Sequence, residues 1–502
     1  MKVDVQAGNI TKISSEAIVV NLFQGVTSPS GATGVVDQAI GGLIRQTIQD
    51  KEITGKLNEV VILRPSNGVL SKKVVVVGLG KQEDFTLDSI RQVSASMSLK
   101  LRGAAVKRFA TVVHGTGIGG LDPEDCAQAM VEGAMMGCYR FDKYKSGPNG
   151  DRKTLEGFTI VEQESKKVRK IQDGVNAGLV IGRAVCEARD LINEPSNVLT
   201  PTAMADYAKA AAKKLGLTCK ILEEADCKKL GMGSFLSVTK GSDEPAKFIV
   251  LEYRGAKTKE GWIALVGKGV TFDTGGISLK PGAGMWGMIG DMSGSAACFK
   301  ALCACAELKL PVNAVAILPM VENMPSGKAT KPGDIVTALS GKTIEVLNTD
   351  AEGRLILADA LTYSEKYKPK AILDIATLTG AASVALGRQH AAVMGTNAVV
   401  MQAVKDAAKK TGERVWELPV GKEYDSLIKS DSADMKNIGD GSAGTIVGGV
   451  FLKKHLSEKA PWVHIDMASV MGEDKERPYM PKGMSAFGTR LLIQFLRDFP
   501  SQ

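Results

Sequence analysis

Short runs of β-branched residues alternate with helical periodicity along the first part of the chain. The runs at 17–22, 73–78 and 109–113 predict strands, and the segments 89–101 and 125–136 predict helices. A polar stretch at 143–153 leads into one more strand. Residues 166–192 then predict a long helix that ends at Asn193-Glu-Pro-Ser-Asn197. We therefore predict an α/β domain over residues 1–165 and a connecting helix over 166–192.

The remainder of the chain, residues 193–502, repeats the alternation on a larger scale. Apolar runs at 248–253, 262–267, 312–318, 343–347, 371–375 and 463–467 predict strands, with helices between several of them. Strands separated by helices indicate a mostly parallel central sheet that is covered on both faces. We predict a second, larger α/β domain, whose ligands should bind beyond the carboxyl ends of its strands.

Composition narrows the class of protein. Hydrophobic residues make up 44% of the 502 positions and charged residues 24%, which excludes a disordered or fibrous chain. No apolar run reaches the roughly 18 residues of a membrane span, and the N-terminus carries no apolar signal segment, so we expect a cytoplasmic protein. The eight cysteines are then expected to stay reduced. Cys303 and Cys305 point to opposite faces of an apolar helix predicted over 296–308 and should not share a metal ion.

A glycine pattern in the first domain has two interpretations. Gly115-Thr-Gly-Ile-Gly-Gly120 fits G-x-G-x-x-G, follows a predicted strand and precedes a predicted helix, as a dinucleotide site requires. It comes late in the domain, however, and Asp142 does not follow an obvious second strand. We favour a tight turn into a helix, and nucleotide binding stays the alternative.

Carboxylates and cations gather after two predicted strands of the second domain. Lys268 and Asp273 follow the strand at 262–267, and Lys280 and Asp291 come next. The strand at 343–347 leads into a segment with the acidic residues Asp350 and Glu352 and the basic residue Arg354. We expect these groups to converge at one edge of one sheet.

Each of these residues has an alternative structural role, as a helix cap, a helix-dipole partner or a solvated charge. Four carboxylates placed together, however, repel one another unless cations neutralise them. The four histidines lie away from these segments, so the sequence favours an oxygen-rich site for two divalent ions such as Mn²⁺, Mg²⁺, Co²⁺ or Zn²⁺.

These motifs resemble those of a known family. Asn348-Thr-Asp-Ala-Glu-Gly-Arg-Leu355 matches the signature octapeptide of the leucyl (cytosol) aminopeptidases, of the bacterial type. Lys268-Gly-Val-Thr-Phe-Asp-Thr-Gly-Gly276, followed by Lys280 and Asp291, looks like the family's other metal-site segment. The resemblance covers the catalytic half and, more loosely, the N-terminal domain. It implies a metallo-exopeptidase that removes leucine and other mostly apolar residues from the free N-terminus of short peptides.

The resemblance also implies roles for single residues. Two divalent ions, Mn²⁺ or Zn²⁺ in the first place, would be bound by Lys268, Asp273, Asp291, Asp350 and Glu352. A water between two dications can lose a proton near neutral pH and act as the nucleophile. Lys280 would polarise the scissile carbonyl, and Arg354 would hold a bicarbonate ion that serves as the general base.

The remaining expectations concern specificity and assembly. The family pattern places Met288, Thr377, Gly380, Ala468 and Met471 around the pocket for the first side chain, although the same residues could be ordinary core. It also implies a homohexamer. An additional DNA-binding architectural role is the alternative from another class, supported here only by the net charge of +8.

Overall fold

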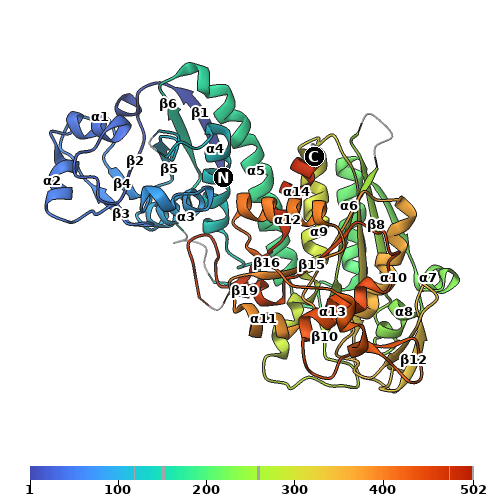
Figure 1. The fold of residues 1–502 in the computed structure, drawn as a ribbon. Coiled ribbons are helices and arrows are strands. Elements are labelled where there is room, and N and C mark those ends of the chain that lie inside the picture. The colour runs from blue at the N-terminus through green and yellow to red at the C-terminus, as the bar shows by residue number, and fades with distance from the viewer. Residues whose placement is uncertain (118, 148–152, 257–260, 474, 500–502) are drawn as a thin grey trace. The chain divides into compact units, whose positions relative to one another are not determined.

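The computed structural model describes all residues except 118, 148–152, 257–260, 474 and 500–502 (Figure 1). The chain forms two compact units. Unit 1 comprises Met1–Cys186 and Asp474–Lys482, and unit 2 comprises Glu187–Glu473 and Gly483–Gln502. The boundary between Cys186 and Glu187 falls inside helix α5 (Ser165–Asn193), the long helix that the sequence predicts.

Unit 1 is built on one six-stranded sheet. Its order is β1 (Lys2–Ala7), β6 (Gly157–Glu162), β5 (Arg108–Thr111), β2 (Ile18–Leu22), β4 (Val74–Gly78) and β3 (Val60–Leu63). All neighbours pair in parallel except β3, which runs antiparallel to β4 at the edge. The carboxyl ends of five strands therefore lie along one edge of this sheet.

Helices cover both faces of the sheet, because a central strand such as β4 carries apolar side chains on both of its faces. In β4, Val75 and Val77 belong to one core cluster while Val74 and Val76 belong to another, as the two-residue period of a strand requires. The first cluster includes helices α3 (Leu87–Gly103), α4 (Pro123–Cys138) and α5. The second includes α1 (Gly31–Ala39) and α2 (Leu43–Gln49).

A buried ion pair joins α3 to α4. Arg91 Nε donates to Glu132 Oε2 at 2.6 Å, and both side chains are at most 2% exposed. Gln128 Nε2 donates to the second oxygen of the same carboxylate at 2.7 Å. Two buried charges of opposite sign are therefore paired inside the core of unit 1.

Unit 2 contains a nine-stranded mixed sheet. Its order is β16 (Val415–Glu417), β15 (Ala391–Gly395), β18 (Trp462–Asp466), β14 (Ala371–Ala376), β9 (Trp262–Gly267), β11 (Asn313–Asn323), β8 (Lys247–Arg254) and β7 (Thr218–Leu222), with β10 (Gly269–Asp273) paired to the far end of β11. The central strands β11, β9, β14 and β18 are parallel. This confirms the predicted α/β class with a mostly parallel central sheet.

Two layers of helices enclose this sheet. The core cluster on one face joins the central strands to α8 (Gly233–Thr239), α10 (Gly353–Ser364) and α13 (Gly444–Lys453). Ile263 and Leu265 alternate with the residues of β9 in that cluster and face the other side, where α9 (Ser293–Glu307) packs across β9, β11 and β14. Helices α6 (Pro201–Leu215) and α14 (Thr489–Asp498) pack on α9, and α12 (Ala398–Thr411) packs on α14.

One predicted strand forms, but it belongs to a different sheet from the one expected. Strand β13 (Thr343–Val346) does not enter the central sheet but pairs with β12 (Asp334–Thr337) and β17 (Met435–Lys436). The cause is local: β12 and β13 form an antiparallel hairpin, closed by the Ala338 N–H donating to the Lys342 carbonyl at 2.9 Å. The segment after β13 therefore reaches the site from a small separate sheet.

The remaining elements are short. They are α7 (Glu224–Leu230), α11 (Gly380–Leu386), the strand pair β19 (Gly472–Glu473) and β20 (Gly483–Met484), and several 3₁₀ turns, of which η4 (Met285–Met292) matters for the site. Among the helices of the described residues, none is long and apolar enough to cross a membrane.

Candidate active site

The site lies where parallel strands of unit 2 end. Lys268 follows β9 directly, and Thr377 follows β14, its parallel neighbour in the sheet. Strand β10 begins after Lys268 and ends at Asp273, beside the last residue of β11. Parallel neighbours end at the same edge, so the backbone alone brings these positions together.

Lys268 is a buried cation held by three acceptors. Its Nζ lies 2.8 Å from Asp291 Oδ2 and 2.8 Å from Glu352 Oε1, and it donates to the Thr377 carbonyl at 3.0 Å. The side chain is only 4% exposed. Burial acts to lower the pKa of this ammonium, but the surrounding carboxylates, chiefly Asp291 and Glu352, outweigh it and raise the pKa.

A glycine provides the space for this lysine. Gly353 is the first residue of α10, and a Cβ atom built there would lie 2.6 Å from Lys268 Cε and 2.7 Å from Nζ. These distances are too short for any real contact, so the lysine can lie against the start of α10 only because position 353 has no side chain.

Lys280 occupies a second position among the carboxylates. Its Nζ lies 2.8 Å from Asp273 Oδ2 and also pairs with Asp350 Oδ1. Its side chain is 21% exposed, against 4% for Lys268. Of the two lysines, Lys280 is therefore the one that a substrate can reach.

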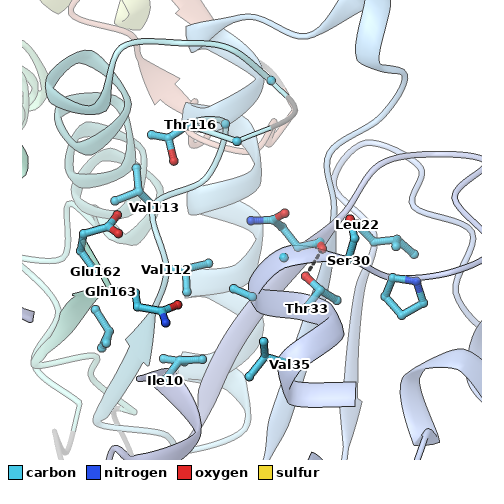
Figure 2. A pocket seen from close by; sticks show the side chains of 18 of the residues that line it. Ile10, Leu22, Ser30, Thr33, Val35, Val112, Val113, Thr116, Glu162 and Gln163 are labelled. Carbon is cyan, nitrogen blue, oxygen red and sulfur yellow. Dashed lines mark hydrogen bonds between the residues drawn. The ribbon is translucent and has the colours of Figure 1, made fainter. Parts of the chain in front are cut away.

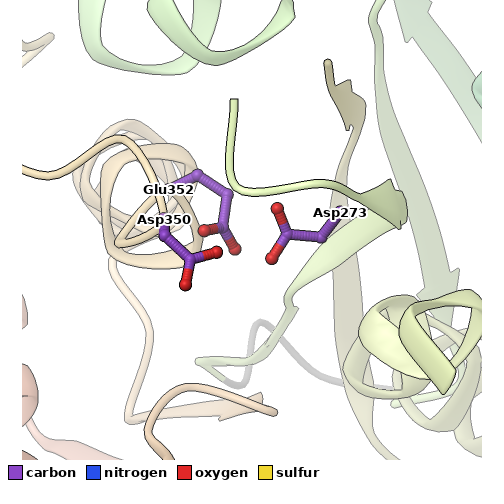
Figure 3. A group of neighbouring side chains, drawn as sticks. All are labelled: Asp273, Asp350 and Glu352. Atoms are coloured by element: carbon purple, nitrogen blue, oxygen red, sulfur yellow. The ribbon is translucent and has the colours of Figure 1, made fainter. Parts of the chain in front are cut away.

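Three carboxylates face one another directly. One oxygen from each of Asp273, Asp350 and Glu352 lies within 4.8 Å of the other two. Figure 3 shows Asp350 and Glu352 where the chain enters a helix, with their carboxylates turned toward Asp273 at the end of its strand. Asp291 completes the group through Lys268, because both Asp291 and Glu352 contact that ammonium.

The four carboxylates carry more charge than the two lysines neutralise. Burial raises the pKa of Asp291, Asp350 and Glu352, because taking these groups out of water disfavours their charged forms. Glu352 Oε2 is buried without a hydrogen-bond donor among the described residues. A buried, unpaired carboxylate oxygen in an oxygen-rich cluster fits divalent cations.

Arg354 lies at the first turn of α10 and is 7% exposed. Its Nη1 donates to the Asn437 carbonyl at 2.7 Å, while its buried Nε has no hydrogen-bond acceptor among the described residues. Burial lowers the pKa of the guanidinium to about 10, so it stays charged at neutral pH. A buried cation with an unused donor can bind a small anion.

Two asparagines that were not identified from the sequence hold the segments around Asp273 and Asp350 in place. Asn323, at the end of β11, donates from Nδ2 to Asp273 Oδ1 at 2.8 Å and to the Thr349 carbonyl at 3.0 Å. Asn437 donates to the Asn348 carbonyl at 2.7 Å and accepts from the Leu347 N–H at 2.9 Å. The position of Asn323 at a strand end could have identified it. Asn437 follows the two-residue strand β17, for which the sequence gives no signal.

The expected substrate-pocket residues are brought together only in part. Thr377 is buried, and its hydroxyl donates to Asp291 Oδ1 at 2.7 Å. A Cβ built at Gly290, in η4, would lie 3.4 Å from Met471 Cε. Met288, Ala468 and Met471 are half-buried, whereas Gly380 is exposed at the start of α11. The structure thus places Thr377 beside the carboxylates and leaves the role of the other four a prediction.

Known proteins match nearly the whole length of this chain. The family model for the catalytic domain of the cytosol aminopeptidases matches residues 186–493, and the model for their N-terminal domain matches residues 19–148. The chain is 44% identical over 501 residues to a probable cytosol aminopeptidase of Alkaliphilus oremlandii, covering 99% of both chains. It is 42% identical over 497 residues to a probable cytosol aminopeptidase of Geobacter sulfurreducens, again covering 99% of both.

Solved structures agree with the sequence comparisons. The bottromycin maturation enzyme BotP is 31% identical, covers 97% of this chain and 100% of its own, and superposes with a TM-score of 0.85. A structure of the same enzyme in complex with Mn is also 31% identical, covers 97% and 99%, and has a TM-score of 0.84. With both family models and full-length relatives matched, this chain belongs to the cytosol aminopeptidase family and is a metal-dependent aminopeptidase.

Proposed function

We propose that the chain is a two-metal leucyl aminopeptidase, which removes leucine and other mostly apolar residues from the free N-terminus of short peptides. The observation that carries the proposal is that the carboxylates of Asp273, Asp350 and Glu352 face one another, with one oxygen of each within 4.8 Å of the other two. Asp291 and Lys268 extend the same cluster through contacts of 2.8 Å.

The proposed ligands of the two ions are Lys268, Asp273, Asp291, Asp350 and Glu352. An ammonium has no lone pair, so Lys268 would ligate only as a neutral amine, which neighbouring dications favour. Mn²⁺ is the first choice because the related enzyme BotP has been solved in complex with Mn, and Zn²⁺ is the second. When bound, such ions lower the pKa of water toward about 7 and so supply a nucleophile at neutral pH.

Lys280 is proposed to act on the substrate and not as a ligand. It remains a protonated ammonium, because the negative charge of Asp273 and the contact with Asp350 raise its pKa despite the opposing effect of burial. Its partial exposure lets the ammonium donate to the scissile carbonyl and stabilise the oxyanion that develops there.

Arg354 is proposed to hold a bicarbonate ion as the general base. The support is its charged, buried guanidinium with an Nε donor that has no acceptor among the described residues. A planar guanidinium matches a planar carbonate with two parallel hydrogen bonds. In this proposal Arg354 would hold and orient the ion, which would supply the general base.

The direct test of the proposal is hydrolysis of leucine p-nitroanilide before and after chelation, followed by addition of Mn²⁺ or Zn²⁺. We expect chelation to abolish hydrolysis and metal to restore it, with about two ions per chain by elemental analysis. Asp273→Asn and Glu352→Gln should lose metal and activity together. Asp406→Asn is the matched control, because Asp406 is exposed on α12 and accepts a hydrogen bond from Gln402, away from the carboxylate cluster. An active enzyme without bound metal refutes the proposal.

Variants of the basic residues separate binding from chemistry. Lys280→Ala should keep both ions while kcat falls about 100-fold or more, equivalent to about 2.7 kcal/mol of transition-state stabilisation. Lys268→Ala should instead lower metal affinity along with the rate. Arg354→Ala should abolish the stimulation of carbonate-free enzyme by bicarbonate. Loss of the ions in Lys280→Ala, or a full bicarbonate response in Arg354→Ala, contradicts these assignments.

Assembly and location are extensions of the same proposal. We propose a homohexamer in the cytoplasm, the compartment for which the relatives are named. The DNA-binding alternative stays a prediction from the net charge of +8, and a filter-binding affinity that falls steeply with salt would support it.

A further inference from the structure

Unit 1 contains a cavity of about 330 Å³ that the aminopeptidase site does not use (Figure 2). It opens where the parallel strands of the six-stranded sheet end. Its lining includes Gly8 after β1, Phe23 after β2, Val112 after β5 and Gln163 after β6. Ligands of open α/β sheets bind at this edge, and the volume lies within the roughly 300–1,000 Å³ of small-molecule sites.

One wall of the cavity is rich in backbone amides. It includes Ser30, the N-cap of α1, together with Gly31 and Thr33 of the first turn. The N–H groups of a first helical turn have no acceptor within the helix, and the Ser30 side chain forms no capping hydrogen bond with them. The Thr33 hydroxyl already donates to the Asn21 carbonyl at 2.6 Å (Figure 2), so on this wall the amides and the Ser30 hydroxyl are the donors for a ligand.

The glycine pattern of the sequence forms the adjoining wall. Gly115, Thr116, Gly117 and Gly119 all line the cavity. The segment is a tight turn, as expected: the Leu121 N–H donates to the Gly115 carbonyl at 3.1 Å, and Gly115 has φ 94°. A Cβ atom built at Gly117 would meet nothing within 4 Å, so at that position the backbone is open to a ligand.

The rest of the lining mixes apolar side chains with polar and charged ones, among them Lys167 and Glu164, which pair with one another. Ile10 lies on one side and Val35 on the other in Figure 2, and Val35 is 43% exposed although it is apolar. Glu162 and Gln163 follow from the end of β6. The Glu162 carboxylate disfavours a phosphate at its own end of the cavity and favours hydroxyl or amino donors there.

We infer that this cavity binds a nucleoside diphosphate. The phosphates would lie against the amides of the α1 start and the Gly115–Gly117 turn, where the helix dipole favours negative charge. The base would lie between Ile10 and Val35, and the sugar hydroxyls would donate to Glu162. The two interpretations of the glycine pattern are then compatible, because the same tight turn forms a phosphate-binding wall.

Calorimetric titration of the full-length protein with ADP, adenosine and inorganic pyrophosphate tests the inference. We expect ADP to bind with a Kd below about 1 mM, at least tenfold more tightly than either fragment, because both ends of the cavity contribute. Gly117→Asp should weaken ADP at least tenfold by placing a carboxylate against the phosphates. Gly147→Asp, at another glycine with open space around it, is the matched control and should stay within twofold of the parent.

A second variant keeps the test decisive if Gly117→Asp fails to fold. Val35→Ser, at an exposed position, should weaken ADP and adenosine but not pyrophosphate. Asp273→Asn should leave ADP binding within twofold, because the cavity lies in unit 1. The inference is overturned if no heat is seen up to about 5 mM ADP. It is also overturned if pyrophosphate binds as tightly as ADP, or if neither cavity variant changes binding.

Discussion

A single methyl group at position 353 should disturb the active site. In Gly353→Ala the new Cβ would lie 2.6 Å from Lys268 Cε and 2.7 Å from Nζ, so the lysine must move. It has little room, because its side chain is 4% exposed and its ammonium has acceptors on three sides. Movement away from Asp291 and Glu352 leaves buried carboxylates without their cation.

The size of the effect follows from two opposing terms. Breaking a buried ion pair by removing one partner costs about 3–5 kcal/mol. Alanine is a better helix former than glycine by at most about 1 kcal/mol, and position 353 begins α10 with an ordinary φ. The net expectation is a loss of about 2–4 kcal/mol in the free energy of unfolding of the metal-free protein.

Urea unfolding in the presence of a chelator measures this loss, and elemental analysis with leucine p-nitroanilide hydrolysis measures the loss of function. Gly103→Ala is the matched control, because Gly103 is also in a helix and a Cβ there meets nothing within 4 Å. This control should be stabilised by about 0.5–1 kcal/mol. If Gly353→Ala is as stable as the parent and keeps its metal and activity, then Lys268 is not confined as described.

Three further expectations test other parts of the molecule. Burial lowers the pKa of His455 to about 3, so on acidification the unfolded chain takes up the proton at a higher pH than the folded chain does. The free energy of unfolding should therefore fall by about 1.4 kcal/mol per pH unit below about pH 6.5. Urea unfolding at pH 7.5 and pH 5 measures this slope, which His455→Gln should reduce. Glu132→Leu should cost about 3–5 kcal/mol by removing the carboxylate that pairs with the buried Arg91, whereas the double variant with Arg91→Met should recover most of it in the same assay. Light scattering should give six times the 53.1 kDa chain mass, and a monomer mass at working concentrations would exclude the hexamer.

Local sequence patterns were sufficient to predict the features of the fold that depend on a single strand or helix. The valine run of β4 is apolar at every position, and such a strand is stable only between two layers of helices. The parallel pairing of β9, β14 and β18 likewise follows from the alternation of strands and helices along the chain. Lys268 could be placed at the site edge because it directly follows such a strand.

Contacts between distant segments could not be predicted in this way. Strand β13 was expected in the central sheet, but pairing with its neighbour β12 across a short turn takes precedence over a long-range partner. Asn437 supports the Asn348 segment from 89 positions away, and no local periodicity marks such a residue. The cavity in unit 1 forms from the ends of five strands, β1, β2, β4, β5 and β6, so it exists only once the sheet is assembled.

The two lysines among the carboxylates affect the order in which the chain folds and binds metal. A cluster of buried acids without cations would oppose folding, as in small domains that remain unfolded until metal arrives. Here Lys268 and Lys280 are covalently attached counter-ions, within 2.8 Å of Asp291, Glu352 and Asp273. We therefore expect the chain to fold before any ion is available. On the proposed two-metal function, loading would then be a separate, later event, and the supply of each metal would decide which ion the folded protein carries.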